Sequence, residues 1–315
     1  MQSIMNTSPT PESRIWAVLS HLSALLMGMG IILPIIGWSD QRRKSNYASF
    51  QTLQALGYQS LGYTIWLLLY LVSIIVTSII VLVAVEPGSG SSGNPDAVLV
   101  PWTIAFTAVV LGFLALYLLL PIIAAIACAL GKDFRYPIMG DRLARYLGYD
   151  PVRKSEEQAW LIEDHEFHWV AAMGHFSVLI MLWGMLAPLT AWILHGKRSL
   201  FLKFQSIQTF VYQAVVTVLY FVGAFLYIGG LFALIASMGW LGQSEGSSSP
   251  GIVGIVIFGV LLALGGVIIL VIPLLHILGQ WAGYRVLKGE DYRYPLVGRL
   301  VERWISKKSV EEKPA

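Results

Sequence analysis

The chain has 315 residues, of which 56% are hydrophobic and 12% are charged, about half the charged fraction of a soluble domain. The formal net charge of +3 is small, and we expect no nucleic-acid partner. This composition excludes an ordinary soluble domain and indicates an integral membrane protein.

Six runs of the sequence contain no Lys, Arg, Asp or Glu: 15–39, 59–85, 97–130, 167–194, 204–243 and 247–284. A bilayer core about 30 Å thick is crossed by about 20 apolar helical residues, so each run is long enough to span it. The sequence therefore predicts an all-α, multi-pass membrane protein.

The chain contains one unit twice. His21, Gln51 and Gln54 recur 154 residues later as His175, Gln205 and Gln208, and the register then shifts to 158 residues, which pairs Arg135 with Arg293. Such self-similarity marks an internal repeat. We expect an N-terminal tail (1–13), a first membrane repeat (14–147), a polar linker (148–166), a second membrane repeat (167–305) and a C-terminal tail (306–315).

The first apolar run of each repeat is interrupted by glycine and followed by Pro34 or Pro188. If these runs enter the membrane and return without crossing, all Lys and Arg residues fall on one face, as the positive-inside rule requires. We therefore predict four full spans plus two re-entrant hairpins, in the bacterial cytoplasmic membrane with both termini cytoplasmic. The alternative is six transmembrane helices with inverted halves.

After a basic turn, each repeat continues with an aromatic–glutamine stretch that leads into a long span. Tyr47, Phe50, Gln51 and Gln54 are spaced to share one helical face. That half-aromatic, half-amide face suits hydrogen bonds between helices or the headgroup boundary.

The last span of each repeat is followed by Arg-Tyr-Pro, at Arg135, Tyr136 and Pro137 and again at Arg293, Tyr294 and Pro295. Proline suits the first position of a new helix, and apolar and charged residues then alternate with helical spacing. Each repeat is expected to end in an amphipathic helix lying on the membrane.

These motifs together carry a resemblance. His21-x-Ser23 and His175-x-Ser177 with their downstream prolines, the paired glutamines and the Arg-Tyr-Pro turns resemble the bacterial domain-of-unknown-function family related to the Tic import-channel component of the chloroplast inner envelope. The sequence departs from that pattern where His and Asn are common, having Gln51 and Gln205 at one such position and Gly57 and Val211 at another. The resemblance implies a small helical membrane module, and more weakly a role in protein translocation.

His21 and His175 are the candidate ligands for a haem or metal, since two equivalent imidazoles from symmetric helices can serve that purpose. The preferred interpretation is that they hydrogen-bond to neighbouring helices, assisted by Ser23 and Ser177. Glu163–His168 contains metal-capable side chains but is interpreted as a solvated part of the linker. No catalytic motif is present, so we expect no enzyme activity, cofactor or metal.

The predicted function is a non-enzymatic membrane module, namely an accessory, scaffold or assembly subunit whose partners are the bilayer and other membrane proteins or a second copy. The alternatives are a channel or translocation component, and a haem- or metal-binding membrane protein.

Overall fold

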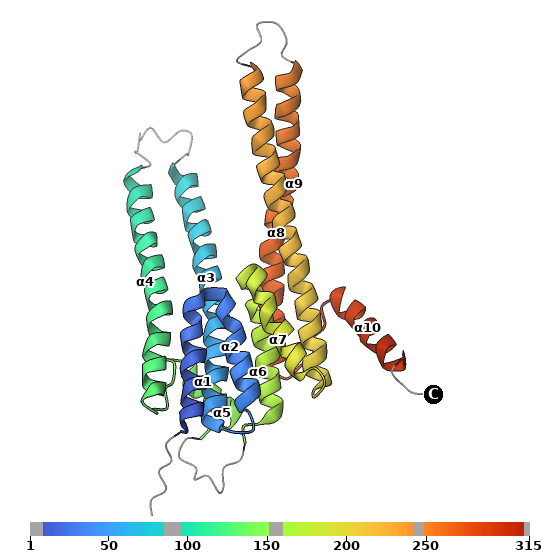
Figure 1. The fold of residues 1–315 in the computed structure, drawn as a ribbon. Helices are drawn as coiled ribbons and strands as arrows, with labels where there is room; N and C mark the ends of the chain where they lie inside the picture. Colours follow the sequence, from blue (N-terminus) through green and yellow to red (C-terminus); the bar gives the residue numbers. More distant parts are fainter. Residues whose placement is uncertain (1–8, 85–95, 151–159, 242–248, 312–315) are drawn as a thin grey trace, which may run out of the picture.

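The computed structural model describes residues 9–84, 96–150, 160–241 and 249–311. Within these ranges the chain is helical and contains no strand (Figure 1). The first repeat comprises α1 (Pro11–Leu22), η1 (Ser23–Ile31), α2 (Ile32–Gln41), α3 (Asn46–Ala84), α4 (Asp96–Ala129) and α5 (Gly140–Leu147). The second comprises α6 (Glu163–Phe176), η2 (Ser177–Met185), α7 (Leu186–His195), α8 (Leu200–Leu241), α9 (Ser249–Leu287) and α10 (Val297–Glu311).

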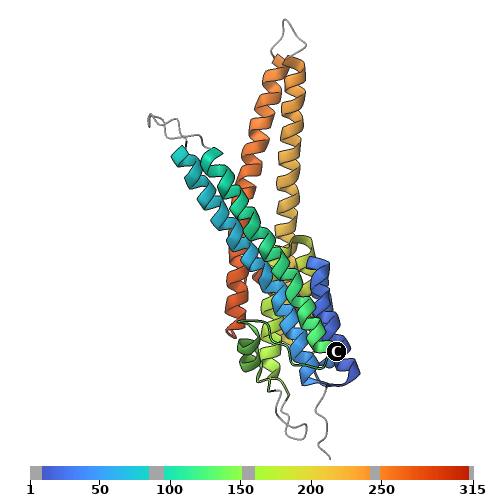
Figure 2. The ribbon, with the colours of Figure 1, turned by 90° about the vertical axis from the view of Figure 1, so that its left-hand side faces the viewer.

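Six helical segments of the described chain are long and apolar enough to cross a membrane: Pro11–Gln41, Asn46–Ile80, Val98–Ala129, Glu163–His195, Leu200–Met238 and Ile252–Leu287. The prediction of an all-helical multi-pass membrane protein is confirmed. The long helices α3–α4 and α8–α9 form two tall pairs that splay apart away from their shared base (Figures 1 and 2).

The first segment of each repeat is bent back on itself. Met27 has φ 52° and ψ −138°, and Met181 has φ 49° and ψ −131°, the conformation of the first central residue of a type II′ turn. A Cβ on Gly37 of α2 would lie 3.0–3.1 Å from Trp16 and Ser20 of α1. The two arms therefore run side by side, as α1 and α2 do in Figure 1. The reversal falls on a methionine, close to but not at the glycines.

Each hairpin reaches only part of the way along its long neighbour. The amide Nε2 of Gln59 donates to Ser23 Oγ (2.9 Å), which places the end of α1 level with Gln59. That level is about 20 Å from the start of α3 at a rise of about 1.5 Å per residue. Gln213 and Ser177 make the equivalent bond at 3.2 Å. Leu26 and Met27 at the hairpin tip are 54% and 42% exposed, so the tip presents apolar side chains.

The turns that carry the basic residues gather at the end of the molecule opposite the splayed helix tips. There Tyr47 Oη donates to the carbonyl of Lys132 (3.1 Å) and Tyr146 Oη to the carbonyl of Leu287 (3.2 Å). The first bond joins the start of α3 to the turn that follows α4, and the second joins α5 to the end of α9.

The helices after the Arg-Tyr-Pro turns differ from each other. In α5 the apolar residues Leu143 and Leu147 are fully buried in the protein core, so that face packs on protein. In α10, Leu300 and Trp304 are 61% and 48% exposed, as a helix on a membrane surface requires. Pro137 and Pro295 open the turns before α5 and α10 and are not the first helical residues.

Candidate functional site

Each repeat contains a buried polar network centred on its histidine. His21 is fully buried; its Nδ1 lies 3.0 Å from Tyr136 Oη and its Nε2 lies 3.0 Å from Gln51 Oε1. The three residues come from α1, α3 and the turn after α4, so one imidazole joins three parts of the repeat.

The surrounding acceptors define how the protons are arranged. Gln51 Nε2 donates to Asp133 Oδ1 (3.0 Å) and to the carbonyl of Phe134 (2.9 Å). Both are pure acceptors, so the Gln51 carbonyl oxygen must face the imidazole and accept from Nε2–H of His21. His21 Nδ1 then accepts from Tyr136 Oη. Burial raises the pKa of the Tyr136 phenol well above its usual range, so this hydroxyl keeps its proton.

Gln54 extends the network to the backbone. Its Nε2 donates to Gln51 Oε1 (3.2 Å) and to the carbonyl of Phe134 (3.0 Å), while its Oε1 accepts from the backbone N–H of Tyr136 (3.0 Å). The Tyr136 ring stacks on Tyr58 with centroids 4.2 Å apart. The Arg-Tyr-Pro turn is thereby fixed against α3 through both its backbone and its side chain.

The second repeat reproduces this network bond for bond. His175 lies 2.9 Å from Tyr294 Oη and 3.0 Å from Gln205 Oε1. Gln205 donates to Asp291 and to the carbonyl of Tyr292, Gln208 donates to Gln205 and Tyr292, and Tyr294 stacks on Tyr212 at 3.9 Å. In the second repeat Thr209 Oγ1 also lies 3.0 Å from His175 Nδ1, at a position that is Ala55 in the first.

The remaining residues singled out in the sequence surround the network. Arg135 forms ion pairs with Asp133 (3.3 Å) and Asp141 (2.6 Å), and Arg293 does so with Asp291 and Glu302. Ser23 and Ser177 bond to Gln59 and Gln213, not to the histidines. Pro34 and Pro188 are buried in α2 and α7, whereas Pro137 and Pro295 are exposed.

The geometry offers little to a haem or metal. Both ring nitrogens of His21 and of His175 already have side-chain partners, so a ligand bond would displace one of them. The described residues contain no group of three or more His, Cys, Asp or Glu side chains able to hold a metal ion.

The sequence reasoning missed a buried ion pair where the repeats meet. Arg42, 3% exposed, lies 3.3 Å from Glu166, 1% exposed, and 2.8 Å from Glu163. Trp38 Nε1 also donates to Glu166 Oε1 (3.0 Å), and the guanidinium lies over the Phe167 ring. The interpretation of Glu163–His168 as a solvated part of the linker was wrong for Glu166, which is buried in α6, whereas Glu163 and Asp164 at the start of α6 are exposed. The spacing of 154 residues aligns Glu166 with Glu12 near the start of α1 but aligns Arg42 with Gly196, so the repeat did not point to the pair.

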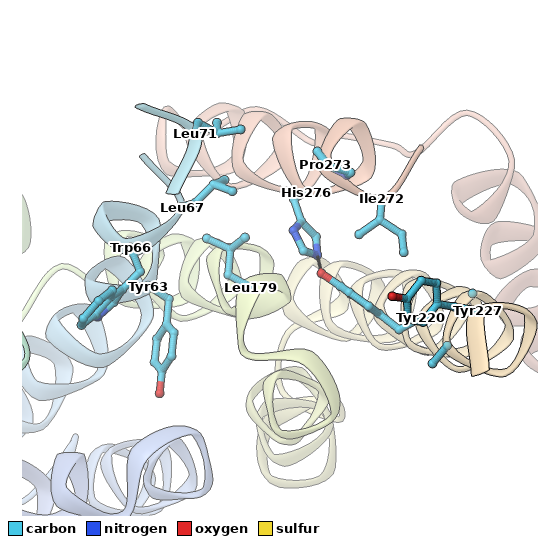
Figure 3. A pocket seen from close by; sticks show the side chains of 12 residues that line it. Tyr63, Trp66, Leu67, Leu71, Leu179, Tyr220, Tyr227, Ile272, Pro273 and His276 are labelled. Atoms are coloured by element: carbon cyan, nitrogen blue, oxygen red, sulfur yellow. Dashed lines mark hydrogen bonds between the residues drawn. The ribbon is translucent and has the colours of Figure 1, made fainter. Parts of the chain in front are cut away.

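A cavity of about 490 Å³ lies between the two tall helix pairs (Figure 3). Tyr63, Trp66 and Leu67 of α3 line one side, and Tyr220 and His276 of α8 and α9 line the other. Tyr220 Oη and His276 Nε2 are 3.2 Å apart, and the rest of the lining is mainly aliphatic and aromatic.

Fold and site together define a multi-pass helical membrane protein built from two copies of one unit, each held by a histidine-centred network. The chain belongs to the MamF/MmsF family, the magnetosome magnetite crystal formation protein family, whose model matches residues 12–143 and 166–301. Each match covers one repeat. No curated protein and no solved structure matches the chain.

The expected relationship to the Tic-related family was wrong, because both repeats match the magnetosome family. The motifs behind that expectation are short. In the structure they serve to pack helices: the serines and glutamines tie the hairpin to the long helix, and the Arg-Tyr-Pro turn closes the network. Motifs of this kind indicate how the helices pack and do not by themselves identify a family. The inference of protein translocation, which was drawn from them, is withdrawn.

Proposed function

We propose that the protein is a non-enzymatic structural component of the magnetosome membrane, in which the two repeats act as a scaffold during magnetite crystal formation. One observation carries this proposal: the two most chemically capable side chains, His21 and His175, are wholly buried and bonded at both ring nitrogens. A general acid, base or ligand needs access to its reactant, and these groups have none.

The proposal includes the membrane arrangement of four full spans and two re-entrant hairpins. It is supported by the turns at Met27 and Met181 and by the serine–glutamine bonds that end each hairpin partway along its long helix. Irregular backbone is tolerated at membrane depth where protein covers it. Gly28, directly after the turn, is buried against Ile180 and Trp183, so protein covers the backbone on that side of the turn while the side chains of Leu26 and Met27 stay exposed.

The experiment is complementation of a deletion strain in the magnetosome-forming host with a graded series of network variants, such as Tyr136→Phe, His21→Phe and the double variant. Crystal size and number are measured by electron microscopy, and folded protein in purified magnetosomes by quantitative blotting. We expect crystal size to follow the amount of folded protein across the series. A variant present at the wild-type level that nevertheless gives deletion-like crystals would indicate chemistry at the histidine and overturn the proposal.

A further inference from the structure

A second cavity, of about 450 Å³, lies where α5 packs across the junction between the repeats. Its walls include Leu61 of α3, Leu143 and Tyr146 of α5, Trp169 of α6 and Leu287 of α9. These elements come from both repeats, and α5 lies at the end of the molecule away from the splayed helix tips (Figure 1). The volume falls within the range of ordinary ligand pockets, so the space is large enough for part of a lipid-sized molecule.

The two ends of this cavity differ in polarity. At one end Leu61 belongs to the charge-free run 59–85. At the other end Tyr146 Oη donates to the carbonyl of Leu287 (3.2 Å), the last residue of α9, and the exposed Lys288 follows. The cavity therefore extends from the apolar part of α3 to the level of the basic turns. In a bilayer this is the direction from hydrocarbon to headgroup.

Arg142 places a positive charge at this cavity. The residue lines the cavity and is exposed. Its neighbour Asp141 is bound to Arg135 (2.6 Å), and within the part of the chain that the structure describes Arg142 forms no ion pair. The corresponding position of the second repeat is Leu300, so this cation is a feature of the first repeat alone. A cation beside an apolar cavity is complementary to an anionic group that carries an apolar chain.

The open side of the cavity carries a strained residue. Ile138 lines the cavity, is 81% exposed and has φ 67°, and the backbone N–H of Met139 donates across it to the carbonyl of Pro137 (2.7 Å). A γ-turn with positive φ is rare and strained, and a β-branched residue is a clear outlier there. Its counterpart Leu296 does not have positive φ. Strain of this kind clusters at ligand-binding positions, and here it holds a large apolar side chain at the opening.

We propose that this cavity binds one anionic phospholipid, with the phosphodiester at Arg142 and an acyl chain against Leu61 and Ile138. Basic pockets between membrane helices on the cytoplasmic side bind such headgroups, and the acyl chain covers the apolar side chain that Ile138 exposes. The lipid then contacts α3 and α5 of the first repeat and α6 and α9 of the second, and strengthens the junction between the repeats. This inference is independent of the role in crystal formation.

The test is native mass spectrometry of the full chain in mild detergent, titrated with phosphatidylglycerol or with phosphatidylcholine of the same acyl chains. We expect one phosphatidylglycerol retained per chain, with a preference of about fivefold over phosphatidylcholine, the effect of one basic side chain on an anionic lipid. Arg142→Gln should abolish that preference. Arg145→Gln is the matched control, because Arg145 is exposed on the same helix but is not part of the cavity wall, and it should keep the preference.

Two further variants test the acyl-chain part of the cavity. Leu61→Trp fills the apolar end and should reduce retention of phosphatidylglycerol, whereas Val215→Trp, at the exposed counterpart of Leu61 on α8, should not. Ile138→Gly should raise the unfolding temperature without lipid, because glycine adopts positive φ freely, and yet lower retention of the lipid.

Three results overturn the proposal. The first is equal retention of the two lipids by the wild-type chain, and the second is an unchanged preference in Arg142→Gln. The third is displacement of phosphatidylglycerol by inorganic phosphate at equal concentration, which indicates a site for free anions and not for a lipid. Arg142→Gln changes only an exposed side chain, so its result does not depend on whether Leu61→Trp folds.

Discussion

Gly30 lies directly against the backbone of Ser23: a Cβ at position 30 would be 1.8 Å from the Ser23 carbonyl oxygen. The second repeat repeats this approach, at 2.0 Å between Gly184 and Ser177. The hairpin can therefore close only if this position has no side chain. This explains why glycine is found here although the residue with positive φ is the methionine three positions earlier.

Gly30→Ala and Gly184→Ala should each destabilise the protein by at least about 1–3 kcal/mol, the usual effect of overpacking, because the clashing atom is backbone and cannot move aside. Gly112→Ala and Gly259→Ala are the controls, since a Cβ at either position meets nothing within 4 Å. These should be neutral or stabilising by up to about 1 kcal/mol. Thermal unfolding in detergent, followed by circular dichroism, measures the difference. Equal effects at all four sites would contradict the hairpin geometry.

Met27→Gly and Met181→Gly should be tolerated or stabilising by up to about 1 kcal/mol, because glycine adopts positive φ without steric cost. Met27→Ile should be destabilising, since a β-branched residue is strongly disfavoured at φ 52°. The same unfolding assay tests this. If Met27→Ile is as stable as Met27→Gly, the turn does not lie at residue 27.

The two histidine networks should respond differently to loss of the tyrosine hydroxyl. Tyr136→Phe leaves His21 Nδ1 buried without its donor and should cost about 1–3 kcal/mol. Tyr294→Phe should cost less, because Thr209 Oγ1 lies 3.0 Å from His175 Nδ1. Its hydroxyl donates to the Gln205 carbonyl (2.6 Å) and can turn to Nδ1 instead, since that carbonyl lies within α8 and keeps its helical N–H donor. Adding Thr209→Ala to Tyr294→Phe should remove that advantage. A double-mutant cycle gives the coupling energy, and equal costs for the two single tyrosine variants would refute this assignment of Thr209.

Removing one partner of the buried Arg42–Glu166 pair should cost more stability than removing both partners together. Arg42→Met leaves Glu166 uncompensated and should destabilise the protein by about 3–5 kcal/mol. The double variant Arg42→Met with Glu166→Leu should recover most of that loss, although the Trp38 indole then lacks its acceptor. Lys44→Met, which removes two exposed pairs, with Asp40 and with Glu12, is the control and should change stability by less than about 1 kcal/mol. A double variant no better than Arg42→Met would show that the pair is not isolated from solvent.

Features that depend on residue type and spacing could be predicted from the sequence, whereas contacts between residues far apart in the chain could not. The charge-free runs predicted the helices and the 154-residue spacing predicted the duplication, because composition and repeat spacing can be determined from the sequence alone. The histidines, glutamines and tyrosines were singled out by their recurrence alone. That they form one network could not be predicted, since His21 and Tyr136 are 115 residues apart. The Arg42–Glu166 pair occurs only where the repeats meet, so the comparison of the two repeats did not reveal it.

Labelling of isolated magnetosomes tests the orientation. Such vesicles expose their cytoplasmic side, so an impermeant thiol reagent should label Ser45→Cys and Ser199→Cys but not Ser89→Cys or Ser248→Cys, all on a Cys128→Ala background. The basic turns gather at one end of the fold, and each Lys or Arg near an anionic leaflet gains about 1 kcal/mol, so that end should face the cytoplasm. Ser89 and Ser248 lie outside the described residues, in the segments that join α3 to α4 and α8 to α9. All four sites should be labelled once detergent opens the vesicles. Labelling of only one of Ser45→Cys and Ser199→Cys in intact vesicles would mean that residues 163–195 cross the membrane, and would contradict the arrangement with two re-entrant hairpins.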